Sequence, residues 1–404
     1  MTGPLDWWHL GEALGVTVIV SFLTWYGVYI FQAYSMQDAK MQKSPSLLNP
    51  LPTGIWQMYG VENEGTRYIA VGSYQPNADG DTSAALWQSP DGGYSWNWMH
   101  YDDQLQGPIM LSNGQHAQRT MLGIASTGNG SLIVGKDNAL DGVTRGRVWR
   151  LRAGVDTVEP ADDIPLPTAY SFTGYGEHGS EAVLVGYTDH DAMVWHRDRN
   201  TAWAPISIGD SKITDVKSVY YQKGEWILTG NTKSTDPDYS PNLTDENNYW
   251  HNDAAIWTSK DGIHWLQAAG LSGVKGSQKI SDVVYIQDQW LAVGEDDSGD
   301  PAEMDPAVWV SSDSHNWQRI DERALKIPGW QTMTGAAVSP DKRHVIVVGL
   351  ERPRFHREGN EPAPPSTNQP TRSAAWEIDF APRRGGKSPL EVFRELVEWV
   401  HSAD

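Results

Sequence analysis

The sequence predicts an all-β protein, a six-bladed β-propeller, with one N-terminal transmembrane helix and a C-terminal amphipathic helix. Three observations lead to this fold class. Apolar runs that end in glycine recur along the chain, and each is followed by a second apolar run that contains a tryptophan. Residues 13–34 carry no charged side chain, and the residues after 383 keep helical spacing.

The repeats define the propeller. Their first runs end at Gly72, Gly135, Gly186, Gly230, Gly294 and Gly349. Their second runs contain Trp87, Trp149, Trp195, Trp257, Trp309 and Trp376. Such a unit, without helical period, fits a four-stranded blade, and six units in one array favour a ring over two β-sandwiches. We predict the propeller over residues 54–382. Five or seven blades remain open, because ring closure can combine strands from both chain ends.

Composition excludes several classes of function. The formal net charge of −20 argues against nucleic acid as a partner, because no basic stripe offsets it. Zero cysteines exclude disulfides, thiolate catalysis and Cys-ligated metals. Twenty tryptophans against six phenylalanines indicate that Trp fills one repeated slot. The sequence predicts no cofactor.

The N-terminal region predicts a membrane anchor. A tail over 1–12 precedes a span over 13–35, long enough to cross a hydrocarbon core of about 30 Å. A cleaved signal peptide is the alternative, but it would need a basic first segment. Thr17, Ser21 and Thr24 share one helix face, which suits packing against integral membrane proteins as well as lipid. Residues 36–53 are expected to be a Pro-rich linker.

The side of the membrane follows from the flanking charges. Lys40 and Lys43 follow the span and no basic residue precedes it, so the positive-inside rule places the propeller in the cytoplasm. An extracytoplasmic propeller is the alternative.

Two insertions and the chain end offer binding surfaces. Residues 231–252 and 353–371 interrupt equivalent places in the fourth and sixth repeats, so we expect both on one face, where they could bind protein partners. The alternative is that the two insertions are flexible loops without a binding role. Ser388-Pro389-Leu390-Glu391 has a capping-box pattern, which predicts an amphipathic helix within 383–404.

Three segments link a serine, an aspartate and a tryptophan at fixed offsets. Residues 89–96 read SPDGGYSW, while 259–265 and 311–317 are one residue shorter. The pattern resembles the Asp-box, the BNR repeat of sialidase-like β-propellers. The box positions are Ser89, Asp91, Gly93, Trp96, Ser259, Asp261, Trp265, Ser311, Asp313 and Trp317. This resemblance implies the fold, a structural turn remote from any active site, and frequent export of family members.

The same resemblance sets a test for catalysis. A sialidase needs an arginine cluster for a substrate carboxylate, a tyrosine nucleophile with a glutamate partner, and an acid. No FRIP-like segment opens the first repeat, and the arginines gather at 145–152 and near the C-terminus. The sequence therefore predicts no catalytic residues and a protein that is not an enzyme.

The anchor has a resemblance of its own. The uncharged span running into Tyr29-Ile30-Phe31-Gln32 and Met36-Gln37 is similar to the N-terminal helix of the H subunit of purple-bacterial photosynthetic reaction centres. That helix has its N-terminus outside and its soluble domain in the cytoplasm.

One acidic loop could bind a metal. Asp296, Asp297 and Asp300 could offer oxygen ligands to Ca²⁺, with a solvated turn as the favoured alternative. The histidines show no metal-binding spacing.

These observations predict a membrane-anchored, non-catalytic propeller that serves as an accessory or scaffold subunit of a larger membrane complex, energy-transducing or photosynthetic by the weak hint of the anchor. The alternative is a membrane-tethered glycan-binding or glycosidase-like propeller, which convergent carboxylates and arginines in the central funnel would favour. A tethered sensor is a third option.

Overall fold

The computed structural model describes residues 40–43, 47–48, 54–76, 82–99, 109–110, 116–138, 143–153, 157–189, 191–198, 201–208, 213–234, 252–271, 276–300, 303–320, 329–353 and 372–379. Met41–Ile378 form one compact unit. Every element in the described ranges is a strand, and none of their residues form a helix suited to cross a membrane. The predicted helices over 13–35 and 383–404, with Thr17, Ser21 and Thr24, lie outside these ranges. So do most of the two insertions.

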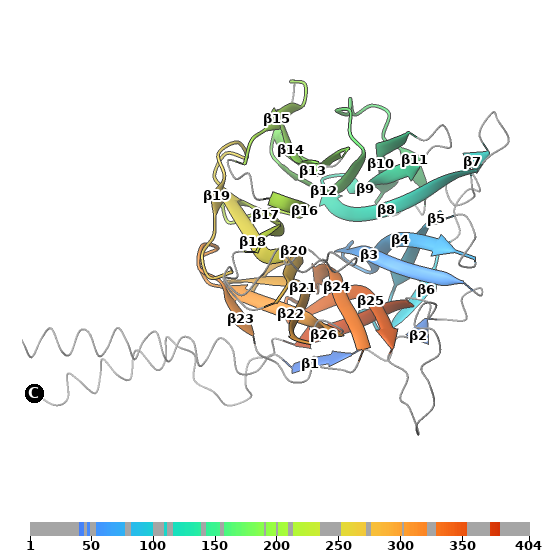
Figure 1. Ribbon diagram of the computed structural model, residues 1–404. Helices are drawn as coiled ribbons and strands as arrows, with labels where there is room; N and C mark the ends of the chain where they lie inside the picture. The colour runs from blue at the N-terminus through green and yellow to red at the C-terminus, as the bar shows by residue number, and fades with distance from the viewer. Residues whose placement is uncertain are drawn as a thin grey trace, which may run out of the picture. The chain divides into compact units, whose positions relative to one another are not determined.

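Six sheets, here called blades 1 to 6, surround a common axis (Figure 1). Consecutive strands within them pair antiparallel, whereas β2 adds to blade 1 in parallel. From the inside outward, blade 1 contains β3 (Ile55–Asn63), β4 (Tyr68–Gln75), β5 (Ser83–Ser89), β6 (Ser95–Trp98) and β2 (Leu47–Leu48). In the same order blade 2 contains β8 (His116–Thr127), β9 (Gly130–Asn138), β10 (Thr144–Arg152) and β11 (Val158–Pro160), and the short β7 (Ile109–Met110) pairs with the start of β8. Blade 3 contains β12 (Ser171–His178), β13 (Glu181–Thr188), β14 (Asp191–Asp198) and β15 (Ala204–Ile206).

The second half of the chain repeats this order. Blade 4 contains β16 (Ile213–Gln222), β17 (Glu225–Lys233), β18 (Asn252–Ser259) and β19 (Leu266–Gln267). Blade 5 contains β20 (Gln278–Ile286), β21 (Gln289–Asp300), β22 (Glu303–Ser311) and β23 (Gln318–Ile320). Blade 6 contains β24 (Gly329–Val338), β25 (His344–Pro353), β26 (Arg372–Asp379) and β1 (Lys40–Lys43).

The six predicted blades are therefore confirmed. Both ends of the propeller sequence contribute to blade 6, because β1 extends a sheet whose other strands come from the C-terminal part of the chain. The short strands β1 and β2 fall inside the segment expected to be a linker.

The apolar runs that end in glycine form the second strand of each blade, not the innermost one. Each inner strand has a bulge opposite the glycine. The bulge pushes a backbone carbonyl towards the second strand, so a Cβ on Gly72 would lie 1.8 Å from the oxygen of Gln57. On Gly294 it would lie 1.9 Å from the oxygen of Lys279. The repeated glycine is thus a consequence of the bulge.

The tryptophans of the third strands fill the space between blades. All six are buried, at 0 to 3% exposure. Trp149 packs with Ile69 and Val71 of blade 1, and Trp309 packs with Ile227 and Ile256 of blade 4. Each of these side chains joins its own blade to the preceding one, so the core is a set of interblade layers. This is the repeated slot that the composition predicts.

Candidate functional site

The inner strands surround an axial hollow of about 720 Å³. Six bulge residues mark one end of it: Tyr59, Leu122, Thr173, Lys217, Ser281 and Thr334. From there the hollow extends along each inner strand towards the turn that leads to the second strand. This volume lies in the range of about 300–1,000 Å³ that small-molecule sites occupy.

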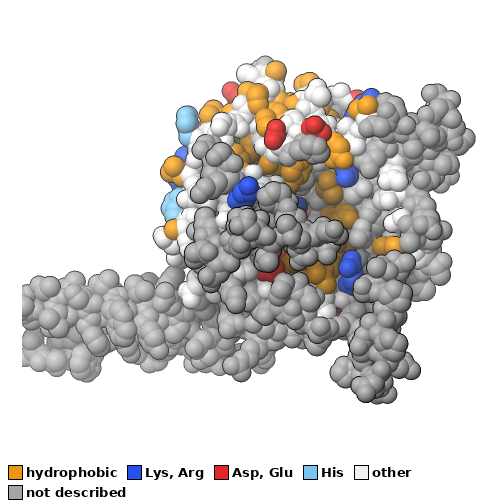
Figure 2. All heavy atoms as spheres, viewed as in Figure 1, with side chains coloured by type: hydrophobic (Ala, Val, Ile, Leu, Met, Phe, Trp, Pro, Cys, Tyr) orange, Lys and Arg blue, Asp and Glu red, His pale blue; other side chains and the backbone are white. Residues whose placement is uncertain are grey.

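The registers show on which face the hollow opens. Asn63 ends β3 opposite Tyr68, and Tyr68 pairs with Ser89, where the first Ser-x-Asp turn begins. The hollow and the Ser-x-Asp turns therefore share one end of the ring. Each of the two insertions connects the second strand of its blade to the third. The described residues that flank them therefore lie at the opposite end of the ring from the Ser-x-Asp turns. On the face drawn in Figure 2, scattered charged side chains lie among hydrophobic ones.

The residue after each bulge approaches the next blade closely. In four blades it is glycine, and a Cβ on Gly123 would lie 2.4 Å from the oxygen of Thr173. On Gly335 it would lie 2.8 Å from the Cα of Gly60. The equivalent positions in blades 4 and 5 hold Ser218 and Asp282. A carboxylate thus occupies a ring position that glycine fills in four of the six blades.

Asp282 is held by its neighbours on two sides. Its Oδ1 accepts a hydrogen bond of 2.8 Å from the N–H of Val283, and its Oδ2 accepts one of 2.9 Å from the N–H of Ala336 in β24. The side chain is half-buried and lines the hollow.

Glu62 in β3 is the second carboxyl group of the hollow. Its Oε1 accepts from the N–H of Asn63 at 2.9 Å, and its Oε2 accepts from the N–H of Ser126 in β8 at 3.3 Å. The side chain is half-buried as well. Like Asp282, it joins two blades through backbone donors while it faces the axis.

Burial raises the pKa values of both groups. Burial raises the pKa of Glu62 to about 7, against the lowering effect of the donors on Asn63 and Ser126, and the charge on Asp282 adds to the rise. Burial raises the pKa of Asp282 to about 6, although the two backbone N–H groups oppose it. At a pH between these two values Glu62 is mostly protonated and Asp282 is mostly ionised.

Three further polar side chains face the same hollow. Burial, and then the charges of Glu62 and Asp282, raise the pKa of Tyr220 to about 12, so it remains a phenol that can donate a hydrogen bond. Burial also raises the pKa of Tyr59. Burial acts to lower the pKa of Lys217, but Asp215, whose Oδ2 lies 2.7 Å from Nζ, raises it above its usual value.

The predicted Ser-x-Asp residues form three similar turns. In the first, Ser89 Oγ donates to Asp91 Oδ1 at 2.8 Å, and the N–H of Gly93 donates to Ser89 Oγ at 2.8 Å. Ser95 closes the turn by donating its N–H and hydroxyl to Asp91. Trp96 is fully buried beneath the turn. The serine and aspartate therefore satisfy the backbone of the turn, as expected from their residue types.

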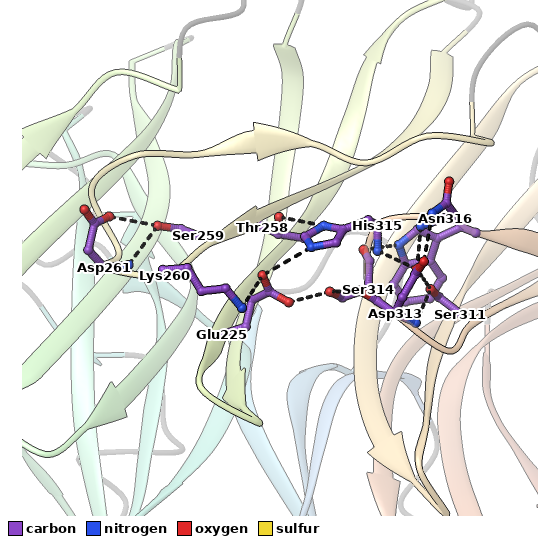
Figure 3. A network of polar contacts seen from close by, with 11 residues as sticks. Glu225, Thr258, Ser259, Lys260, Asp261, Ser311, Asp313, Ser314, His315 and Asn316 are labelled. Carbon is purple, nitrogen blue, oxygen red and sulfur yellow. Dashed lines mark hydrogen bonds and ion pairs between the residues drawn. The ribbon is translucent and has the colours of Figure 1, made fainter.

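The two shorter turns use the same bonds and touch each other's blades (Figure 3). Asp261 and Asp313 each accept two backbone N–H groups that follow them in sequence. Ser259 and Ser311 donate to these aspartates at 3.1 Å and 3.0 Å. The closing tryptophans bond to the turns directly: Trp265 Nε1 donates to Gly262 O at 3.1 Å, and Trp317 Nε1 donates to Ser314 O at 2.8 Å.

A buried carboxylate joins the turns of blades 4 and 5. Glu225, at the start of β17, accepts a hydrogen bond from the Ser314 hydroxyl (Figure 3). Its Oε1 lies 3.0 Å from Lys260 Nζ and 3.7 Å from His315 Nε2. The same carboxylate thus contacts one residue of its own turn and two of the next.

A fourth turn of this kind was not predicted from the sequence. Between β24 and β25, Ser339 Oγ donates to Asp341 Oδ1 at 2.6 Å, and the N–H of His344 donates to Ser339 Oγ at 2.9 Å. The sequence Ser-Pro-Asp at 339–341 is the same as that at 89–91, so it could have indicated this turn.

The predicted calcium ligands are engaged elsewhere. Asp296 is buried and its Oδ2 lies 2.7 Å from Arg319 Nη2. Asp297 accepts a hydrogen bond from the N–H of Ser277. Asp300 ends β21, and its side chain is outside the described residues. Among the residues that the structure describes, no three acidic or histidine side chains are grouped to hold a metal ion.

No protein-family model matches the chain, and no curated protein matches it in sequence. Solved structures do resemble it. An α-L-arabinofuranosidase of Fusarium graminearum, solved with an iminosugar inhibitor, has 11% identity and a TM-score of 0.50 over 85% of this chain and 98% of that one. The endosialidase of phage phi92 has 10% identity and a TM-score of 0.47, with 87% and 70% covered. YCF48 bound to a D1 peptide has 12% identity and a TM-score of 0.45, with 87% and 98% covered.

These likenesses establish the fold and correct one expectation. At such low identity the likeness to the arabinofuranosidase shows the β-propeller fold alone. Because a propeller of this fold can be a glycoside hydrolase, as the arabinofuranosidase is, the prediction that this protein is not an enzyme is wrong as an inference from the fold. The missing arginine cluster argued against one reaction only, and catalysis remains open to the residues of the hollow.

Proposed function

We propose that the axial hollow binds a carbohydrate and cleaves a glycosidic bond, with Glu62 as the acid and Asp282 as its ionised partner. The observation that carries this proposal is a pair of half-buried carboxyl groups on one hollow, with pKa values of about 7 and about 6. Glycoside hydrolysis commonly needs such a pair, one protonated and one ionised at the working pH.

Each group has a defined part in this chemistry. Protonated Glu62 donates its proton to the oxygen of the leaving group as the glycosidic bond breaks. Ionised Asp282 either removes a proton from an attacking water or attacks the sugar carbon itself. Tyr220 and Tyr59 supply aromatic surface and hydroxyl donors for a sugar ring. Hydrolysis is expected to be fastest near about pH 6.5, midway between the two pKa values, because there Glu62 is mostly protonated while Asp282 is mostly ionised.

The test is a panel of chromogenic glycosides with the purified full chain in mild detergent. We expect hydrolysis of at least one α-L-arabinofuranoside, sialoside or mannoside, and at least a hundredfold loss in Glu62→Gln and Asp282→Asn. Asp163→Asn is the matched control, since that aspartate lies outside the ring, 66% exposed and paired with Arg150. No hydrolysis in the panel, together with no binding on a glycan array, would reject the proposal.

A second proposal concerns the partners of the protein. The uncharged stretch at residues 13–34 supports anchoring in a membrane, and the insertions at 231–252 and 353–371 support docking to an integral membrane complex, as an accessory subunit. The positive-inside rule, applied to Lys40 and Lys43, would place the propeller in the cytoplasm. The hydrogen bonds of the Ser-x-Asp turns support their assignment to the Asp-box repeat.

Native gels of mildly solubilised membranes, with mass spectrometry of the band, test the accessory role. Migration within a large stoichiometric assembly is expected. Migration as a single species of about 45 kDa plus detergent would contradict it. That result would leave the proposal for the hollow untouched.

A further inference from the structure

Strained backbone is concentrated at the mouth of the hollow. In the described part of the chain, six residues other than glycine have left-handed backbones, a region that L-residues avoid. Four of the six line the hollow, in the turns that end the inner strands of blades 4, 5 and 6. These four residues, here called the rim, are Lys223, Gln287, Asp288 and Lys342.

The turn of blade 5 carries strain that its equivalents avoid. Ile286 pairs with Gln289, so Gln287 and Asp288 form a two-residue turn, with φ of +46° and +60°. Positive φ at both positions is typical of the type I′ turn, in which Asn-Gly is the favoured pair. The two-residue turns at the same place in blades 2, 3 and 4 each contain a glycine, namely Gly128, Gly179 and Gly224. Blade 5 therefore keeps two side chains where glycine would relieve the backbone.

The rim residues bond to one another across the blades. Lys223 Nζ donates to Asp288 Oδ1 at 3.3 Å, and it lies 5.1 Å from the centre of the Tyr285 ring. The Tyr285 hydroxyl donates to the same carboxylate oxygen at 3.1 Å. Gln287 Nε2 donates to the carbonyl oxygen of Lys342 at 3.0 Å. These bonds join blades 4, 5 and 6, so the rim is fixed before any ligand binds.

Two acceptor atoms of the rim are available to a ligand. Within the described ranges, no residue donates to Asp288 Oδ2 or to Gln287 Oε1. The side chain of Asp288 is 88% exposed, and hydrogen bonds from Tyr285 and Lys223 hold the pKa of its carboxyl group below its usual range. It is therefore an ionised acceptor at neutral pH. Lys223 and Lys342 add ammonium donors to the same rim.

This set of groups suits the hydroxyls of a sugar. A hydroxyl both donates and accepts, so adjacent hydroxyls can meet an ionised acceptor and an ammonium donor together. One carboxylate and two ammonium groups leave the rim with little net charge, which does not favour a strongly charged ligand. Backbone strain of this kind persists where neighbouring contacts fix it, and it is typical of ligand clamps.

We propose that the rim binds the hydroxyls of a neutral oligosaccharide, at a sugar ring next to the one that Glu62 and Asp282 act on. The inference rests on the proposed function and adds a substrate class to it. The strand β20 connects the two places, because it contains Asp282 and the turn at 287–288 follows its end. A single-sugar glycoside would reach the two carboxyl groups without using the rim.

A variant with the favoured turn separates binding from folding. Gln287→Asn together with Asp288→Gly relieves the backbone, removes the carboxylate and shortens the amide. The equilibrium constant for unfolding should fall about threefold or more, because the lost ion pair is largely exposed. The Kd for an oligosaccharide should rise at least about tenfold. Asp288→Asn keeps a residue that tolerates this backbone but removes the charge, so it should raise the Kd about fivefold without a gain in stability.

The probe is an array of neutral di- to hexasaccharides, followed by calorimetric titration of the full chain in mild detergent with the oligosaccharide that binds best. Urea unfolding measures stability. Asp189→Gly is the matched control, because Asp189 has φ of +52° in a turn at the opposite end of the ring. It should raise stability and leave the Kd unchanged. An unchanged Kd in the turn variant, or a turn variant less stable than the wild type, would overturn the proposal for the rim.

The two proposals fail separately. If the wild-type protein binds an oligosaccharide that the turn variant loses, but cleaves no glycoside, the rim stands and the proposed reaction falls. If it cleaves chromogenic glycosides but binds no oligosaccharide on the array, or binds one equally well in the turn variant, the reaction stands and the rim falls. Neither binding nor cleavage would reject both.

Discussion

Ser314 donates a hydrogen bond through its hydroxyl to the carboxylate of Glu225 in the preceding blade. Ser314 takes the place that Gly262 has in the neighbouring turn, and both have left-handed backbones, with φ of +66° and +69°. A non-glycine residue in this region is strained by about 1 kcal/mol. The bond to buried Glu225 offsets that strain by joining two blades.

Variants of Ser314 should separate these two effects. Ser314→Ala keeps the strain and removes the donor, so we expect a loss of about 1–2 kcal/mol in the free energy of unfolding. Ser314→Gly also removes the donor but relieves the backbone, so its loss should be about 1 kcal/mol smaller. Urea unfolding measures both. Equal stability of the alanine variant and the wild type would contradict the contact.

The close approach of inner strands predicts a sharp contrast between two glycines. Gly123→Ala should destabilise the protein by about 2 kcal/mol or more, because its Cβ would lie 2.4 Å from the oxygen of Thr173 in the next blade. Gly128→Ala, in the turn after the same strand, would meet no heavy atom within 4 Å. Thermal unfolding should leave this control within about 0.5 kcal/mol of the wild type.

The raised pKa values predict how stability changes with pH. Glu62 and Asp282 hold protons in the folded protein that they release in the unfolded chain, so stability should fall as pH rises from about 4 to about 7. Solvent in the hollow reduces the effect to about 1–2 kcal/mol. Glu62→Gln should flatten the upper part of this profile. A wild-type profile that rises across this range would contradict the assignment.

The Ser-x-Asp turns predict the opposite dependence. Hydrogen bonds from the N–H and ring of His264 hold the pKa of Asp261 below its usual range. Its stabilising effect should therefore be present above about pH 4 and be lost as pH falls further. Asp261→Asn should cost less than about 1 kcal/mol at pH 7, because the group is largely exposed, and progressively less as the pH falls below about 4. Asp191→Asn, at an exposed position that begins β14, is the control.

Sequence patterns predicted the parts of the fold that burial on both faces dictates. The second strands are continuous apolar runs, such as the one from Tyr68 to Gly72, because neighbouring blades cover both of their faces. The tryptophans identified the third strands equally well, because each fills the same buried position between two blades. Inner strands were not, because one face lines the hollow and a bulge shifts their alternation at Met58 and Gly60.

The candidate site was hidden for the same reason. Glu62 and Asp282 belong to no motif, and their meeting depends on ring closure between distant blades. One signal was present in the repeats: Thr229 precedes Gly230 where valine precedes the other five glycines. Reading that change as a hydrogen bond to Ser218, which stands where four other blades have glycine, would have required the register of β16, which only the structure supplies.

The shared origin of blade 6 has a consequence for biosynthesis. Its outer strand β1 leaves the ribosome first among the blade strands, whereas β26 leaves last. Blades 1 to 5 can therefore form during translation, but the last sheet has to wait for residues 372–379. Until then the first strand has no partner in its sheet, so closing the ring is the final step of propeller assembly.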